Sequence, residues 1–197
     1  MLKIGLTGGI ASGKTRISNL FNQLETPIID TDIISRDILK LGQPGYLEIV
    51  NHFGGSNVLD DDQIDRRKLR QLIFNNSTEK HWLESVLHPL IFEQSKQQIR
   101  QYSQAKYVVV VIPLLFETDF GQLVDRVLAV DCSAETQFKR LLLRDKIDMA
   151  LAQRMISQQW SNLDRINHAD DIIHNNSNDD LDAQVTELHQ QYLRLSN

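Results

Sequence analysis

Residues 8–15 read Gly8-Gly9-Ile10-Ala11-Ser12-Gly13-Lys14-Thr15, which matches G-x-x-x-x-G-K-[ST], the pattern of a phosphate-binding P-loop. The residues on both sides fit the strand and helix that such a loop joins. Leu2 to Thr7 predict a short buried strand, and apolar residues from Ile17 to Leu24 recur at helical spacing. Because a strand precedes the motif and a helix follows it, we interpret it as functional rather than as a glycine-rich turn with a chance lysine.

Each residue type in the motif has a physical role toward a bound phosphate. Glycine lets the backbone turn with positive φ and come close to the ligand. Successive N–H groups then point at the anion from a helix N-terminus, where the helix dipole also favours negative charge. Lys14 supplies a mobile positive charge for the β- and γ-phosphates, and the Thr15 hydroxyl is a ligand for Mg²⁺.

Composition favours an intracellular globular protein. The 197 residues suit one domain with an inserted lobe, and 41% are apolar, enough for a substantial core. The net charge of −5 argues against nucleic-acid and membrane partners, and we expect a monomer or a weak homo-oligomer. The single cysteine, Cys132, excludes a disulfide framework and indicates a cytoplasmic location. The first residues do not resemble a signal peptide, and no stretch approaches the roughly 18 apolar residues of a membrane span.

A carboxylate follows the second predicted strand. Pro27 to Asp30 form a short apolar segment, and residues 33–41 have a helical pattern. Asp32 is therefore expected near the carboxyl end of a strand, at the sheet edge where open α/β sheets bind ligands and where the P-loop also lies. Asp32 as an N-cap of the next helix is the alternative, although Asp30 or Thr31 suits that role as well.

The residues from Tyr46 to about 105 are almost wholly helical in pattern. We expect helix stops at Gly54-Gly55 and at His88-Pro89, a solvated turn at Asp60-Asp61-Asp62 and a helix start near Asn76. The stretch is too long for a simple crossover between strands, so we interpret it as an inserted lobe for a second substrate.

Three more strands complete the predicted sheet, over residues 107–112, 126–131 and 171–173. Residues 107–112 are apolar on both faces, which is typical of a buried parallel strand. A final helix carries one apolar stripe from Leu181 to Leu195. Together the pattern predicts an α/β fold, a P-loop NTPase-type three-layer sandwich with a parallel five-stranded sheet, an inserted helical lobe and a lid.

The motifs favour a small kinase among P-loop proteins. There is no N-K-x-D segment of the kind that reads guanine, and the Walker-B-like strand at residues 127–131 runs straight into a helix start. What remains is a P-loop, a carboxylate at position 32 and a helix bearing Arg140 and Arg144 on one face. Arginines and Mg²⁺ neutralise charge during phosphoryl transfer, and a carboxylate can take a proton from a hydroxyl acceptor. Asp32 therefore favours a hydroxyl over a phosphate as the acceptor.

Segments along almost the whole chain resemble the dephospho-coenzyme A kinase family. His88-Pro89-Leu90-Ile91 and Pro113-Leu114-Leu115-Phe116-Glu117 make the resemblance specific, since a P-loop alone would not name the family. Further similar segments, in the same order, are Leu6 to Ile10, Ile29 to Asp32 with Arg36, Asp65-Arg66-Arg67, Asp125-Arg126-Val127, Arg140 with Arg144-Asp145, and Ala169 to Asn176.

The resemblance implies that ATP phosphorylates the ribose 3′-hydroxyl of dephospho-CoA, giving CoA and ADP in the last step of coenzyme A biosynthesis. It implies ATP and Mg²⁺ as cofactors and Asp32 as the general base, with Lys14 and Arg140 also catalytic. The expected ATP-binding residues are Ala11, Ser12, Gly13, Lys14, Thr15, Arg16, Arg140, Arg144 and Asn175 (or Asn176, on the adenine side), with Thr15 as the metal ligand. The expected dephospho-CoA-binding residues are Thr7, Asp32, Arg36, His88, Leu115, Phe116 and Glu117.

The resemblance also implies three parts: a core of residues 1–32, 106–140 and 166–197, a CoA-binding lobe at 33–105 and a lid at 141–165. The chain departs from the family at Ala11, where glycine is usual, and at Thr15-Arg16 and Thr31. Alanine suits position 11 only if φ there is not strongly positive.

Some assignments have structural alternatives. Arg140 and Arg144 suit an exposed helix face, His88 suits a cap or core position, and Trp160 suits either packing or a ligand contact. Two other functions also remain open: a different hydroxyl-phosphorylating kinase, and a P-loop switch protein that hydrolyses ATP slowly.

Overall fold

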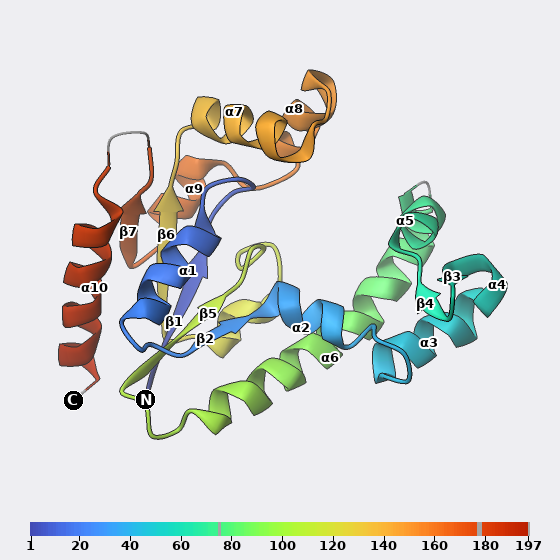
Figure 1. The fold of residues 1–197 in the computed structure, drawn as a ribbon, viewed down its shortest axis with the longest axis horizontal. Helices are drawn as coiled ribbons and strands as arrows, with labels where there is room; N and C mark the ends of the chain where they lie inside the picture. Colours follow the sequence, from blue (N-terminus) through green and yellow to red (C-terminus); the bar gives the residue numbers. More distant parts are fainter. Residues whose placement is uncertain (75, 177–178, 197) are drawn as a thin grey trace. The chain divides into compact units, whose positions relative to one another are not determined.

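The computed structural model describes residues 1–74, 76–176 and 179–196. The chain forms two compact units. The first comprises Met1–Asp30 and Gln98–Asn197, and the second comprises Thr31–Gln97. Elements are labelled as in Figure 1.

The first unit contains a parallel sheet of five strands in the order β2-β5-β1-β6-β7 (Figure 1). The strands are β1 (Leu2–Thr7), β2 (Ile28–Asp30), β5 (Tyr107–Val111), β6 (Arg126–Asp131) and β7 (Asp171–His174). All five lie where the sequence predicts strands. The predicted α/β fold with a five-stranded parallel sheet is therefore confirmed.

Helices α1 and α10 cover one face of this sheet. The helices of the unit are α1 (Lys14–Gln23), α7 (Ala134–Asp145), α8 (Met149–Ser157), α9 (Asn162–Asn167) and α10 (Leu181–Leu195), with a 3₁₀ helix, η1, at Asp119–Leu123. Phe21 of α1 and Tyr192 of α10 are fully buried in one core with Ile4 and Leu128 of the sheet. Each large side chain buried in this way contributes about 1.5–3 kcal/mol of transfer free energy, which is why the apolar stripes of the two helices lie on the sheet.

Strand register places the loops that matter for ligand binding at one edge. Leu6 pairs with both Val111 of β5 and Leu128 of β6, so these parallel strands end near each other. The P-loop leaves β1, the segment from Pro113 to Glu117 leaves β5, and Asn175 follows β7. The carboxyl ends of parallel strands form the ligand-binding edge of open α/β sheets.

The second unit is mainly helical, as the sequence predicts for this stretch. Its elements are α2 (Thr31–Asp37), α3 (Pro44–Phe53), α4 (Gly55–Val58), β3 (Leu59–Asp60), β4 (Gln63–Ile64), α5 (Arg66–Phe74) and α6 (Ser77–Gln101), which extends four residues into the first unit. Ile49, Val58, Leu69 and Leu83 form its buried core. The β3–β4 pair was not predicted, because two-residue strands carry no periodic signal.

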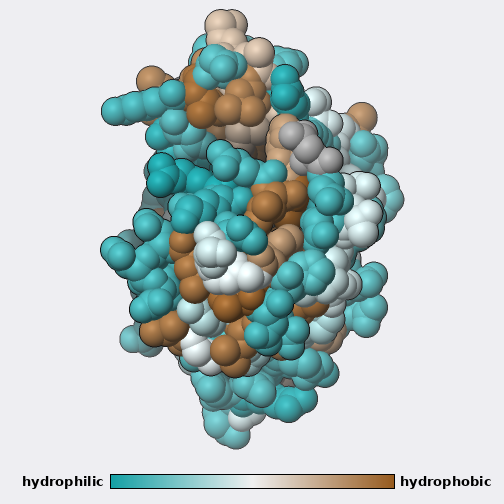
Figure 2. All heavy atoms as spheres, turned by 90° about the vertical axis from the view of Figure 1, so that its right-hand side faces the viewer, coloured by the Kyte–Doolittle hydropathy of each residue, from teal (hydrophilic) through white to brown (hydrophobic). Residues whose placement is uncertain are grey.

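Apolar side chains also reach the surface of this unit. Ile33, Leu41 and Phe74 are among its exposed large apolar residues. Figure 2, with α3, α4 and α5 toward the viewer, shows brown apolar patches between teal hydrophilic side chains. Over the described ranges, none of the helices combines the length and the apolar character that crossing a membrane requires.

The prediction that His88-Pro89 breaks a helix is wrong. Helix α6 runs without interruption from Ser77 to Gln101 with Pro89 in its interior. Proline removes one backbone hydrogen bond and crowds the preceding turn, but packing along the helix can outweigh that local cost. Leu83 and Ile91, buried on either side of the proline, supply such packing.

Candidate active site

The P-loop wraps around the ammonium group of its own lysine. Lys14 Nζ donates to the carbonyl oxygens of Gly8 at 2.7 Å and Gly9 at 3.1 Å. Helix α1 begins at Lys14, and Gly13 precedes it with φ 98°, a conformation that favours glycine. The loop thus presents a positive charge at a helix N-terminus, as binding of a polyphosphate requires.

The backbone conformation of Ala11 differs from the one that we expected. Its φ is 56°, in the left-handed region, although we expected alanine only where φ is not strongly positive. The left-handed conformation costs an L-residue with a Cβ roughly 1–2 kcal/mol. The fold therefore holds Ala11 in a strained conformation within the phosphate-binding loop.

Two predicted ATP-side residues support the loop through the carbonyl oxygen of Ser12. Asn175 Nδ2 donates to it at 2.6 Å, and Arg140 Nη1 lies 3.5 Å from it. Asn175 is buried and packs so close to Gly13 that a Cβ there would lie 2.1 Å from Asn175 Nδ2. Arg140 Nη1 also lies 3.6 Å from Cys132 Sγ. Burial raises the pKa of the Cys132 thiol, and the positive charge of Arg140 opposes that shift.

Arg144 has a different partner from Arg140. Its guanidinium forms a bidentate pair with Asp145, at 2.6 Å and 2.9 Å. The hydrogen bond from Arg144 lowers the pKa of Asp145, and the same pair raises the pKa of Arg144. Of the two arginines that the sequence places on one helix face, the structure brings only Arg140 to the loop.

The segment after β5 holds the predicted acceptor-side residues of the first unit. Thr7 Oγ1 donates to the Pro113 carbonyl at 3.4 Å. Leu115 is 3% exposed and packs against Gly5, so its side chain belongs to the core. Phe116 stacks on Trp160 with ring centroids 5.1 Å apart, so Trp160 packs against a predicted substrate residue.

Glu117, in the segment after β5, contacts Trp160 and Arg165 near the end of the predicted lid. Its Oε1 atom accepts a hydrogen bond from the backbone N–H of Trp160 at 3.1 Å and lies 3.5 Å from Arg165 Nη2. Arg165 is 2% exposed. Burial lowers the pKa of its guanidinium, and the nearby Glu117 opposes that shift. Sequence reasoning missed Arg165, because a single arginine in a short helix carries no local signal.

Two further missed residues touch the P-loop. Gln159 Oε1 accepts from the Ile10 N–H at 2.7 Å. Gln137 Nε2 lies against Gly9, where a Cβ would be only 2.5 Å away. Gly9 does not have positive φ, so glycine is needed here for this close approach rather than for backbone conformation.

The second unit carries the remaining predicted substrate residues. Asp32 and Arg36 lie on α2, and Asp32 is in the first turn of that helix. Since the helix begins at Thr31, Asp32 is inside the helix and not its N-cap. Its backbone carbonyl accepts from the Ser35 hydroxyl at 2.8 Å. His88 lies on α6, and its side chain is on an exposed stretch of that helix.

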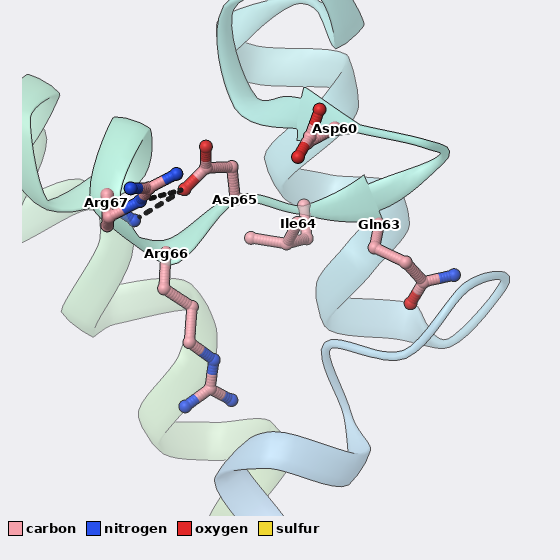
Figure 3. A pocket seen from close by; sticks show the side chains of 6 residues that line it. All are labelled: Asp60, Gln63, Ile64, Asp65, Arg66 and Arg67. Atoms are coloured by element: carbon pink, nitrogen blue, oxygen red, sulfur yellow. Dashed lines mark hydrogen bonds and ion pairs between the residues drawn. The ribbon is translucent and has the colours of Figure 1, made fainter.

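A hollow of about 350 Å³ lies next to the Asp65-Arg66-Arg67 motif of this unit (Figure 3). Asp65 Oδ1 accepts from the backbone N–H groups of Arg67 at 2.8 Å and Lys68 at 3.3 Å, so this carboxylate caps the start of α5. The hydrogen bond from Arg67 is the main cause that lowers the pKa of Asp65. Within this motif the aspartate therefore has a structural role.

Comparison with known proteins identifies the family. The sequence model of a family described as dephospho-CoA kinase matches residues 2–180. A curated dephospho-CoA kinase from Vibrio parahaemolyticus is 44% identical over 196 residues, which cover 98% of this chain and 96% of the relative. The chain belongs to the dephospho-CoA kinase family. The resemblance seen in the sequence is thereby confirmed, and the function is that of a dephospho-CoA kinase in coenzyme A biosynthesis.

Solved structures agree with this family and fold. A dephospho-CoA kinase from Campylobacter jejuni is 28% identical, with a TM-score of 0.74 over 99% of this chain and 98% of its own. A Thermus thermophilus protein has a TM-score of 0.82 over 96% of this chain and 97% of its own; at 23% identity it supports the fold alone.

The dephospho-CoA kinase site must accommodate an ATP-using reaction. Thr15 is exposed at the start of α1, so its hydroxyl is accessible to a metal bound to phosphates, and Arg16 beside it is exposed too. In the part of the chain that the structure describes, no three His, Cys, Asp or Glu side chains are grouped to hold a metal ion. The accessible Thr15 hydroxyl suits Mg²⁺, which often takes few protein ligands and binds with the substrate phosphates.

Proposed function

We propose that the protein transfers the γ-phosphoryl group of ATP to the ribose 3′-hydroxyl of dephospho-CoA. The observation that carries the proposal is the position of Asp32, two residues after β2 ends at the sheet edge that also bears the P-loop. Asp32 accepts the hydroxyl proton, the hydroxyl oxygen forms a bond to the γ-phosphorus, and the bond to ADP breaks. A positioned carboxylate is the group that a hydroxyl acceptor needs and a phosphate acceptor does not.

The ATP contacts are assigned to the first unit. Lys14 neutralises the charge that develops on the transferred phosphoryl group, and Arg140 assists from α7. Bound Mg²⁺, held by Thr15, would neutralise charge on the ATP phosphates. Asn175 contributes through its hydrogen bond to the loop at Ser12. Ala11, Ser12 and Gly13 supply backbone contacts, and Arg16 and Arg144 supply further positive charge.

The residues that we assign to dephospho-CoA contacts are Thr7, Leu115 (through its backbone), Phe116, Glu117, Asp32, Arg36 and His88. Residues 1–32, 106–140 and 166–197 act as the core, residues 33–105 as the CoA-binding lobe and residues 141–165 as the lid. We propose that the enzyme acts in the cytoplasm as a monomer or weak homo-oligomer, without nucleic-acid or membrane partners; the single, buried Cys132 suits that compartment.

A coupled assay of ADP release over a panel of acceptors tests the reaction. ADP should form only when dephospho-CoA is added, and the product should carry its new phosphate on the ribose 3′-oxygen by mass spectrometry and phosphorus NMR. Turnover that depends on another hydroxyl compound would favour a different kinase. Slow ATP hydrolysis that no acceptor stimulates would favour a P-loop switch.

Asp32→Asn tests the base. The amide keeps the size of the side chain but cannot take a proton at neutral pH, so kcat should fall by about 100- to 10,000-fold while the KM for ATP is unchanged. The matched control is Asp37→Asn on the same helix, since Asp37 pairs with exposed Lys40. A kcat for Asp32→Asn equal to that of the control would remove Asp32 from the base role.

A further inference from the structure

Two buried side chains without complete hydrogen bonding converge on Gly9 of the P-loop. Gln137 reaches it from α7 and Arg165 from α9: a Cβ at position 9 would lie 2.5 Å from Gln137 Nε2 and 3.2 Å from Arg165 Nη1. Gln137 is 4% exposed and Arg165 is 2% exposed. Among the described residues, Gln137 Nε2 and the Nε and Nη2 atoms of Arg165 have no hydrogen-bond partner.

Stability of the folded state does not by itself explain why Gln137 and Arg165 are buried here. Burying an amide or a guanidinium without full hydrogen bonding is unfavourable, and well-packed apolar residues often replace buried ion pairs at no loss of stability. The only carboxylate in ion-pair range of Arg165 is Glu117, at 3.5 Å, among the residues that the structure describes. A role in the reaction explains why the charged guanidinium of Arg165 is buried beside Gly9.

Arg165 is linked to Lys14 through the backbone of Gly9. Arg165 touches Gly9, and the carbonyl oxygens of Gly8 and Gly9 hold the Lys14 ammonium group at 2.7 Å and 3.1 Å. A shift of the Gly8–Gly9 turn would therefore move the ammonium group. Misplacement of a reacting group by about 1 Å is enough to cost about 100-fold in rate.

Arg165 is also linked, through Glu117, to Trp160 near the end of the predicted lid. Arg165 pairs with Glu117, and Glu117 Oε1 accepts from the backbone N–H of Trp160. The preceding residue, Gln159, accepts from the Ile10 N–H within the P-loop. Arg165 therefore belongs to one connected set of contacts that joins the segment after β5, residues 159–160 and the P-loop.

We propose that Arg165 is a positioning residue for phosphoryl transfer, which fixes the Gly8–Gly9 turn and through it the Lys14 ammonium group. Gln137 packs against the same glycine and limits its movement. Glu117 orients the guanidinium of Arg165. This inference rests on the proposed role of Lys14 toward the transferred phosphoryl group.

Steady-state kinetics of Arg165→Met and Arg165→Lys test the proposal, with folding checked by circular dichroism and thermal unfolding. Arg165→Met should lower kcat by about 100-fold, a far larger change than in the KM for dephospho-CoA, which reports the loss of the partner of Glu117. Arg165→Lys keeps the charge and should recover part of kcat. Arg194→Met, an exposed arginine near the end of α10, is the control and should keep the wild-type kcat. A folded Arg165→Met enzyme with the wild-type kcat would overturn the proposal, whatever its melting temperature.

A second pair of variants tests the same contact if the Arg165 variants do not fold. Gly9→Ala places a methyl group against Gln137 and Arg165 and should lower kcat, and adding Gln137→Ala should restore part of it by making room. Wild-type kcat in folded Gly9→Ala would contradict the proposal.

Lys14→Ala separates this inference from the proposed function. If Lys14 acts on the phosphoryl group, Lys14→Ala is nearly inactive and adding Arg165→Met lowers kcat little further, because residues that act as a unit are not additive. Full activity of Lys14→Ala would refute the role of Lys14 itself. An inactive Lys14→Ala beside a fully active Arg165→Met would refute only the positioning role of Arg165.

Discussion

At the scale of single residues, the P-loop contains a conformation that its sequence does not favour. Ala11 has φ 56°, in the left-handed region that favours glycine. Glycine takes this conformation without steric cost, whereas a Cβ costs roughly 1–2 kcal/mol. The loop is therefore a place where substitution should relieve strain.

Ala11→Gly should raise the free energy of unfolding by about 0.5–1 kcal/mol, because relief of strain exceeds the entropy that glycine adds to the unfolded chain. Urea denaturation followed by circular dichroism measures the change. The matched control is Ala134→Gly at the start of α7, where φ is not positive, and it should lower stability. Equal destabilisation by both substitutions would show that Ala11 is not strained.

At the scale of elements, α6 contains the one proline in a helix interior among the described residues. Pro89 cannot donate a backbone hydrogen bond to the preceding turn, and proline is about 3 kcal/mol less favourable than alanine inside a helix. Pro89→Ala should therefore raise the free energy of unfolding by up to about 3 kcal/mol. Pro44→Ala, at the start of α3 where proline is tolerated, is the control and should show no gain. No gain from Pro89→Ala would mean that the helix is already relaxed around its proline.

Asp171 joins β6, β7 and α10 at the edge of the sheet. Arg126 binds its carboxylate in a bidentate pair, and Tyr192 donates to it at 3.0 Å. Burial on its own would raise the pKa of Asp171, but the hydrogen bonds from Arg126 and Tyr192 and the positive charge outweigh it, so the pKa lies below its usual value. Burial is also what raises the pKa of Tyr192.

The direction of this shift determines a pH dependence. Because the pKa of Asp171 is lower in the folded state, its stabilising contribution is complete above about pH 4 and is lost as pH falls through the folded-state pKa. Asp171→Asn should cost about 2 kcal/mol at pH 7 and weaken the loss of stability on acidification. Unfolding free energies measured from pH 3 to pH 7 give both quantities, with Glu48→Gln, at an exposed position of α3, as control. A variant with the wild-type acid dependence would contradict this account.

At the scale of the whole molecule, ligands should stabilise the fold through the units that bind them. ATP with Mg²⁺ at 100 times its Kd should raise the free energy of unfolding by about 2.7 kcal/mol, because only the folded state binds it. Hydrogen exchange should show protection by ATP within the unit Met1–Asp30 and Gln98–Asn197, and by dephospho-CoA also within Thr31–Gln97. Lys14→Ala should reduce the ATP effect, and EDTA should reduce it as well. Protection by dephospho-CoA confined to the first unit would argue against the helical lobe as its binding site.

Sequence patterns were enough to predict the first strand with its P-loop and helix, the five parallel strands, the helical insertion and the family. These features depend on local patterns: the loop motif, apolar runs of a few residues and stripes at helical spacing. It also indicated Lys14, Asp32 and Arg140 as candidates, because their residue types and positions at strand or helix ends are visible along the chain.

The side chains that meet at the loop become visible only in the folded protein. Asn175 and Arg140 reach the Ser12 carbonyl across 163 and 128 residues of sequence, and Gln159 reaches Ile10 across 149. Local patterns do not encode such contacts, so Arg165 and Gln137 gave no signal before folding brought them to Gly9. For the same reason, packing over the length of α6 outweighed the local preference of Pro89, and the surrounding loop imposed its left-handed conformation on Ala11.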